Sequence, residues 1–181
     1  MCLFHDGVFI MMSAKPDEKA SMEFLVETEQ AMQDLAAKIA SSANSDHSNS
    51  GLVIFLSGDL GTGKTTFARG FIRALGFDGI VKSPTYTFVE PYNFTVGKTC
   101  YHFDLYRLAD GEELEHIGAR DYFDEQSICL IEWPEKAEAY LPEPDISCSF
   151  TVHERGRQVK IVSLSEKGKS VMLRITSNSS L

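Results

Sequence analysis

Residues 58–65 read Gly58-Asp59-Leu60-Gly61-Thr62-Gly63-Lys64-Thr65, one residue after the apolar run Leu52-Val53-Ile54-Phe55-Leu56. This stretch matches the pattern Gly-x-x-x-x-Gly-Lys-[Ser/Thr] at every fixed position. The apolar run predicts a buried strand before the loop, and helical periodicity over 64–75 predicts a helix after it. A chance match in a glycine-rich turn would lack this context. We therefore predict a phosphate-binding loop.

Each part of the loop has an expected role. Its glycines let successive backbone N–H groups face phosphate oxygens at the N-terminus of a helix, where an anion is favoured. Lys64 is predicted to bridge the β- and γ-phosphates, and the Thr65 hydroxyl to bind a magnesium ion. The other residues of the loop that are expected to bind the nucleotide are Asp59, Gly61, Thr62, Gly63 and Thr66.

Composition limits the size and the partners of the protein. With 181 residues, 43% of them hydrophobic, the chain can bury one core but not two comfortable ones. The formal net charge is −9, and residues 104–145 contain 13 of the 26 acidic residues but only three basic ones. Because such a segment repels a phosphate backbone, we expect no direct binding of nucleic acid. The same acidic segment is a candidate surface for a protein partner.

We divide the chain into a disordered extension over residues 1–20, a single domain over 21–170 and a tail over 171–181.

The cysteines show no Cys-x-x-Cys spacing, so a reduced, cytoplasmic protein is expected. No stretch approaches the length of a membrane span, and a monomer is favoured.

The apolar patterns predict an α/β fold. We expect strands over 22–26, 52–56, 88–90, 100–104 and 128–131, and helices over 28–41, 64–75 and 112–118. The run 128–131 is continuously apolar, as in a parallel strand buried on both faces. Alternation over 146–152 and 159–162 predicts an antiparallel C-terminal hairpin. The fold class is therefore P-loop NTPase-like, with a mainly parallel central sheet flanked by helices.

A phosphate loop needs an acidic group on a neighbouring strand to hold the metal and orient a water molecule. Glu132 follows the apolar run 128–131 and is our preferred residue, since parallel strands end at the same edge of a sheet. Asp104, which closes the strand over 100–104, is the second candidate, and its other interpretation is a carboxylate that caps a helix or braces a loop. His102 is interpreted as a solvated or hydrogen-bonded strand residue.

Three further positions are candidates on residue type and place. Thr85 lies in the hydroxyl-rich segment Ser83-Pro84-Thr85-Tyr86-Thr87, where a switch that senses the γ-phosphate is expected. Arg157, in the predicted hairpin turn, is a candidate for binding a phosphate or ribose, although arginines in turns are usually only solvated. Trp133 follows Glu132 and belongs either near the nucleotide, at a partner surface or in the core.

Four motifs in this order resemble the bacterial ATPase family TsaE, formerly YjeE, of threonylcarbamoyladenosine tRNA modification. They are residues 58–67, 83–87, 102–108 and 131–134, and the similarity runs from about residue 23 to about residue 165. The resemblance implies a compact α/β fold, weak intrinsic ATP hydrolysis, and magnesium held through Thr65 and Glu132. Many relatives carry threonine near the nucleotide where this chain has Met32.

The resemblance also implies a partner. It points to action on the TsaB–TsaD pair, which transfers the threonylcarbamoyl group to adenosine 37 of tRNAs that read ANN codons. ATP hydrolysis would support repeated turnover, and tRNA would be reached only through that complex.

Two other functions use the same loop. A small-molecule kinase usually needs several arginines over the phosphates, and after the loop the region up to residue 120 offers only Arg69, Arg73, Arg107 and Arg120. A GTPase would carry an Asn-Lys-x-Asp segment, which is missing from this sequence. The alternative without catalysis is a nucleotide-gated adaptor that changes shape at residues 83–87.

Overall fold

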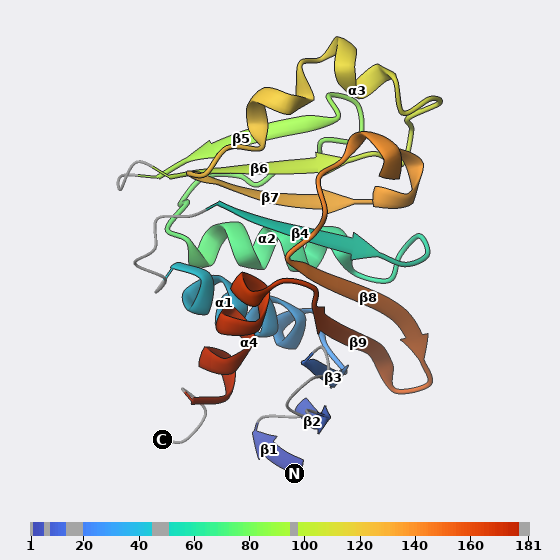
Figure 1. Ribbon diagram of the computed structural model, residues 1–181. Coiled ribbons are helices and arrows are strands. Elements are labelled where there is room, and N and C mark those ends of the chain that lie inside the picture. Colours follow the sequence, from blue (N-terminus) through green and yellow to red (C-terminus); the bar gives the residue numbers. More distant parts are fainter. Residues whose placement is uncertain (1, 6–7, 14–19, 45–50, 95–97, 178–181) are drawn as a thin grey trace.

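The computed structural model describes residues 2–5, 8–13, 20–44, 51–94 and 98–177. One nine-stranded sheet runs through the molecule in the order β1-β2-β3-β9-β8-β4-β7-β6-β5 (Figure 1). The strands are β1 (Cys2–His5), β2 (Val8–Ser13), β3 (Ser21–Val26), β4 (Leu52–Ser57), β5 (Val89–Asn93), β6 (Thr99–Asp104), β7 (Ser127–Glu132), β8 (Ile146–His153) and β9 (Gly156–Ser163).

The centre of the sheet is parallel and its flanks are antiparallel. Strands β8, β4, β7 and β6 are parallel neighbours. The predicted C-terminal hairpin is β8–β9, and β3 continues antiparallel from β9. At the other edge, β5 pairs antiparallel with β6 and carries Pro91. Proline lacks a backbone N–H, and an edge strand tolerates it because one side of that strand has no neighbouring strand to which an N–H would donate. The predicted α/β class is confirmed, and the sheet is mixed, with antiparallel strands on both sides of its parallel centre.

Two hydrophobic cores cover opposite faces of this sheet. The helices are α1 (Glu29–Asn44), α2 (Lys64–Ala74), α3 (Glu113–His116) and α4 (Glu166–Ser177), with three short 3-10 helices, η1 (Ala119–Tyr122), η2 (Pro134–Lys136) and η3 (Glu138–Tyr140). Helices α1, α2 and α4 pack over one core, and α3 with the 3-10 segments covers the other.

Strand β7 lies between the two cores, as its apolar run predicts. Ile128 and Leu130 belong to the core under α1 and α2, and Cys129 and Ile131 belong to the opposite core. All six residues of β7 are buried. The strand that ends in Glu132 is therefore held rigidly on both sides.

The C-terminal helix corrects the predicted tail. Residues 166–177 form α4, whose Val171, Met172 and Ile175 are buried in the first core. The apolar positions i, i+1 and i+4 follow one helical face, but Gly168 and the charged residues around it hide this pattern. The prediction of a tail from residue 171 was therefore wrong for 171–177.

Two other boundaries differ from prediction. Helix α1 continues to Asn44 instead of ending at 41, because Ala43 is buried and the Ser42 hydroxyl donates to the Lys38 carbonyl at 2.9 Å. The expected disordered extension contains β1 and β2, which continue the sheet antiparallel from β3. Residues 14–19 and 45–50 lie outside the described part of the chain.

The packing of α4 through Met172 can be tested by measuring the free energy of unfolding. Met172 is completely buried, so Met172→Ala should lower the free energy of unfolding by about 2–5 kcal/mol, the usual cost of such a cavity. Its neighbour Leu173 is 52% exposed, and Leu173→Ala is the matched control with an expected loss under about 1 kcal/mol. Urea unfolding of both variants measures the difference. Equal losses would contradict the packing of α4 described here.

Candidate functional site

The phosphate loop connects β4 to α2 with positive φ at each of its three glycines, Gly58, Gly61 and Gly63. Gly58 has a φ of 142°, and a Cβ there would lie 2.2 Å from the carbonyl oxygen of Phe150 on β8. Gly63 has a φ of 106°, and a Cβ there would lie 3.1 Å from Cε of Met32. The loop is therefore packed closely between β8 and α1.

Lys64, the first residue of α2, lies at the centre of the loop. Its ammonium donates to the carbonyls of Gly58 at 2.6 Å and Asp59 at 2.9 Å. The ammonium also lies 3.9 Å from the ring centroid of Trp133, a cation–π contact. Burial lowers the pKa of Lys64, and the negative charges of Glu132 and three other acidic side chains oppose that effect. A cation is thus held where the loop would receive phosphates.

Glu132 lies beside the loop. Its Oε2 accepts a hydrogen bond from the Thr65 hydroxyl at 3.0 Å, and its Oε1 lies 2.8 Å from Nε2 of His102. Only 2% of Glu132 is exposed. The structure therefore brings together the two residues, Thr65 and Glu132, that were predicted to hold a metal.

Asp104 connects the site to the predicted switch segment. Its Oδ2 accepts from the Thr85 hydroxyl at 2.6 Å and from the Ser83 hydroxyl at 3.2 Å. Its Oδ1 accepts from the backbone N–H of Tyr106 at 3.1 Å. Bracing a loop, the second interpretation of Asp104, therefore describes its contacts, and the same contacts place Thr85 at the site.

Sheet register explains why these acids converge. Asp104 is paired with Glu132 across β6 and β7, and Glu132 is paired with Leu56, the penultimate residue of β4. The backbone N–H of Trp133 also donates to the Leu56 carbonyl at 3.2 Å. Because all three strands are parallel, their carboxyl ends meet where the phosphate loop begins.

Trp133 lies at the site and not within the sheet. It has a φ of 59°, which is unusual for a bulky side chain and turns the chain sharply after β7. Its ring packs 5.0 Å from the ring of Tyr106 and covers Lys64. The ring therefore lies beside the phosphate loop, and it also packs against the second hydrophobic core.

A pocket of 230 Å³ opens on the other side of the loop. Its lining residues include Thr28, which precedes α1, Met32 of α1, loop residues 61–63, Thr66 of α2 and Arg157 of β9. The Arg157 guanidinium donates to the Gly61 carbonyl at 3.2 Å, so this arginine lies against the loop and not in free solvent. Arg157 is the second residue of β9 and not part of the turn.

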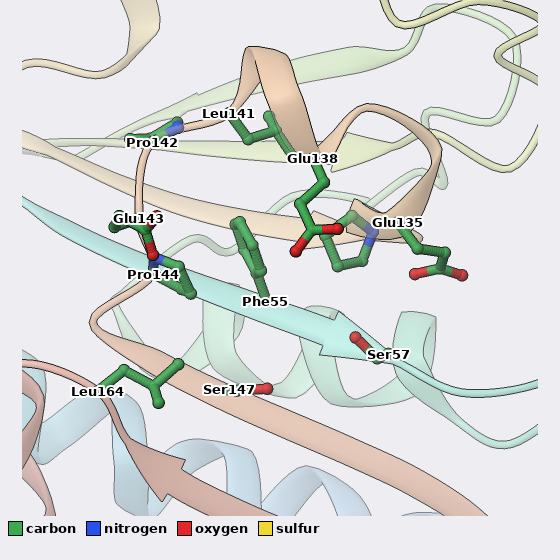
Figure 2. A pocket seen from close by; sticks show the side chains of 11 residues that line it. Phe55, Ser57, Glu135, Glu138, Leu141, Pro142, Glu143, Pro144, Ser147 and Leu164 are labelled. Atoms are coloured by element: carbon green, nitrogen blue, oxygen red, sulfur yellow. The ribbon is translucent and has the colours of Figure 1, made fainter.

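A larger pocket, of 330 Å³, lies along β4 on the opposite face of the sheet. Figure 2 shows Phe55 between Leu141 on one side and Leu164 with Ser147 on the other. Its charged lining residues are all acidic, namely Glu135, Glu138 and Glu143. Phosphate would be repelled there, so we assign this pocket no part in nucleotide binding.

The sequence interpretation missed His102. It is completely buried and hydrogen-bonded to Glu132, so the solvated alternative was wrong and the hydrogen-bonded one is confirmed. The alternation of side chains along β6 was an available signal, because it places His102 on the same face of the sheet as Asp104. Ser83 was also not singled out, although its hydroxyl reaches Asp104.

The donor set suits a magnesium ion. Within the described residues, no cluster of three or more His, Cys, Asp or Glu side chains could hold a metal on its own. Thr65 and Glu132 instead offer hard oxygen donors next to a phosphate loop. Mg²⁺ is usually bound by one or two protein oxygens together with substrate phosphates and waters, so the residues present fit this ion.

Two other features of the chain bear on its environment. Cys100, Cys129 and Cys148 are free and buried, and burial raises the pKa of each thiol. Their thiols are therefore protected from reaction. Across the described segments, no helix combines the length and the apolar character that crossing a membrane requires.

Comparison with known proteins is consistent with this geometry. Residues 26–159 match the family described as threonylcarbamoyl adenosine biosynthesis protein TsaE. The TsaE protein of Haemophilus influenzae is 50% identical over 126 residues, which cover 70% of this chain and 79% of that protein. The TsaE protein of Bacillus subtilis is 47% identical over 93 residues, covering 51% and 57% of the two chains.

A solved structure agrees as well. The crystal structure of Bacillus subtilis YdiB superposes with a TM-score of 0.69 and 25% identity, over 93% of this chain and 97% of that one. The family match covers more than half of the chain and includes the phosphate loop, Asp104 and Glu132. This chain therefore belongs to the TsaE family, whose members are proteins of threonylcarbamoyladenosine biosynthesis on tRNA.

Proposed function

We propose that this protein is a magnesium-dependent ATP hydrolase, slow by itself, that works in the cytoplasm with the TsaB–TsaD complex. In this function it supports repeated formation of threonylcarbamoyladenosine at adenosine 37 of tRNAs that read ANN codons. The observation that carries the proposal is the Thr65–Glu132 hydrogen bond of 3.0 Å, because it joins the phosphate loop to an acid on the neighbouring strand. Loops that only bind phosphate do not need this acid.

The residues of the site divide the chemistry among them. Lys64 would exchange the carbonyls of Gly58 and Asp59 for the β- and γ-phosphate oxygens of ATP. Thr65 and Glu132 would hold Mg²⁺, which supplies positive charge to the phosphates when it is bound. Asp104, which is paired in register with Glu132, would orient the attacking water.

The pocket of 230 Å³ is the proposed place for the nucleoside of ATP. It lies next to Gly61, Thr62 and Gly63, and so continues from the phosphate loop. Arg157 borders both the pocket and the loop, which suits a contact with ribose or phosphate. Met32 brings an apolar side chain to this pocket, where it would pack against the nucleoside.

Thr85 is proposed to sense the γ-phosphate through its bond to Asp104. Thr85→Val keeps the shape but removes the hydroxyl that donates to Asp104 at 2.6 Å. A lost hydrogen bond to a charged group is worth about 1.5–3 kcal/mol, so phosphate release should fall by about 10- to 100-fold. Affinity for ATP should change by less than about threefold, because the phosphate loop is intact.

Thr87→Val is the matched control for this variant. Thr87 lies in the same segment as Thr85 and is exposed, and its hydroxyl donates to Glu90 of β5 at 3.1 Å. Steady-state phosphate release and equilibrium nucleotide binding, measured for both variants, separate the two effects. Wild-type turnover by Thr85→Val would remove Thr85 from the site.

The structure gives little support to a small-molecule kinase. Arg69 is directed to Glu29 at 3.6 Å, Arg120 pairs with Glu115, and Arg107 stacks on Tyr86 at 4.4 Å. None of these contacts is with the loop, and Arg73 is exposed in the last turn of α2. These four arginines therefore do not form the expected group over the phosphates.

A single pair of measurements tests the proposed function. The protein is used to capture purified TsaB–TsaD with ATP, with ADP and without nucleotide, and phosphate release is then measured in the same mixtures. We expect nucleotide-dependent capture together with magnesium-dependent release. Capture with no release would favour the nucleotide-gated adaptor, and release into an added acceptor molecule would favour a kinase.

A further inference from the structure

We propose that His102 is a positioning residue that holds the Glu132 carboxylate in the orientation needed for Mg²⁺. The inference rests on the proposed function and deepens it, since it concerns the same site. His102 is not predicted to touch ATP, the metal or the attacking water. It would act only through Glu132.

The geometry shows a carboxylate held at both oxygens. Nε2 of His102 lies 2.8 Å from Oε1 of Glu132, and the Thr65 hydroxyl lies 3.0 Å from Oε2. His102 and Glu132 are 0% and 2% exposed. One oxygen therefore faces the phosphate loop while the other is tied to the neighbouring strand, away from solvent.

The partners of the His102 ring indicate which atom donates in its bond to Glu132. Nδ1 of His102 has no hydrogen-bond partner among the described residues. A carboxylate that binds Mg²⁺ is ionised and can only accept, so in that state Nε2 carries the proton and donates to Glu132. Nδ1 is then a bare acceptor, which is less costly to leave without a partner than a buried N–H donor. The ring thus makes one directed contact, and Glu132 receives it.

Glu132 needs such a restraint because a cation is close by. Burial lowers the pKa of Lys64, and among the acidic side chains that oppose this effect Glu132 acts most strongly. An unrestrained carboxylate would be drawn toward that ammonium. A direct Lys64–Glu132 ion pair would occupy both groups before nucleotide arrives. His102 is suited to prevent it, because its ring projects from β6, which is paired with the rigid strand β7 at Leu130.

Outer residues that orient metal-binding carboxylates typically affect metal affinity by about 10- to 100-fold. The test therefore compares two amides at the same buried position. In His102→Gln, the side-chain nitrogen is as many bonds from the backbone as Nε2, so it can donate to Glu132. In His102→Asn, the nitrogen corresponds to Nδ1 and falls short of Glu132. Both variants lose the imidazole and keep a polar group.

The main measurement is the gain in affinity for a non-hydrolysable ATP analogue when Mg²⁺ is added, determined by calorimetry. We expect His102→Asn to need about 10- to 100-fold more Mg²⁺ for half of this gain, with unchanged affinity for the analogue in EDTA. His102→Gln should stay within about threefold of the wild type, since the hydrogen bond is restored. Phosphate release should follow the same order, and thermal unfolding reports any difference in stability.

A double-mutant cycle separates positioning from packing. In a Glu132→Gln background, His102→Asn should produce no further change in the Mg²⁺ requirement, because the group that it positions has lost its charge. Equal losses in His102→Asn and His102→Gln, or an additive loss in the double variant, would overturn the inference.

The same experiment distinguishes failure of the inference from failure of the function. A wild-type protein that gains no affinity with Mg²⁺ would overturn the proposed function and the inference with it. Magnesium coupling in the wild type that persists unchanged in His102→Asn would overturn the inference alone.

Discussion

Lys64→Ala is expected to reduce ATP hydrolysis by at least about 100-fold, the cost of removing a preorganised group that stabilises transition-state charge. Lys64 is the one cationic residue among residues 58–65, and its ammonium donates to two loop carbonyls at 2.6 and 2.9 Å. The ammonium is buried beneath the ring of Trp133. Arg157, which also contacts the loop, donates to the carbonyl of Gly61 and so does not take the position of the Lys64 ammonium. Affinity for ATP should also fall, since ground-state contacts with the phosphates are lost.

Arg73→Ala is the matched control for this variant. Arg73 is a cationic residue of the same helix, exposed in its last turn, so its removal changes the net charge equally. Phosphate release with and without TsaB–TsaD, and titration with ATP, should show the wild-type values for Arg73→Ala. Hydrolysis by Lys64→Ala within tenfold of the wild type would mean that the phosphate loop is not the catalytic centre.

Glu132→Gln is expected to show a different pattern, loss of hydrolysis with retained nucleotide binding. The amide keeps the size of the side chain, so the packing at the end of β7 should survive. The charge that would hold Mg²⁺ is lost, and turnover should fall by about 100-fold or more. In EDTA, affinity for ATP should equal or exceed that of the wild type, because a negative group beside the phosphates has been removed.

Glu135→Gln provides the control for charge. Glu135 follows three residues later, is exposed, and also acts electrostatically on Lys64. Its removal should leave the Mg²⁺ requirement of hydrolysis unchanged. If Glu132→Gln hydrolyses ATP at the wild-type rate, the acid of the site is Asp104 instead, and Asp104→Asn becomes the decisive variant.

Both predictions depend on the sheet bringing the carboxyl ends of its parallel strands together. Glu132 and Asp104 are 28 residues apart in sequence, yet they are paired in register on β7 and β6. Glu132 contacts Thr65 and Asp104 contacts Thr85, so a change at either acid acts on a neighbouring part of one site. This closeness is the reason for measuring binding and turnover separately in every variant.

The local patterns of the sequence determined much of this protein. The phosphate loop, the strand before it, the helix after it and the buried strand ending in Glu132 all follow from motif and periodicity, because each depends on neighbours in the chain. The C-terminal hairpin follows from alternation in the same way. The roles of Lys64, Thr65 and Glu132 in catalysis stay predictions, although the structure places these residues together.

Only the tertiary structure decided which distant groups meet. The His102–Glu132 bond, the Lys64–Trp133 contact and the docking of α4 through Met172 each join segments at least 30 residues apart. Local periodicity carries no information on such pairs, because strand order and register depend on the summed packing of the whole sheet. The role of a histidine between apolar residues, or the packing of a helix with a weak apolar pattern and a glycine, depends on which residues the rest of the fold places against it.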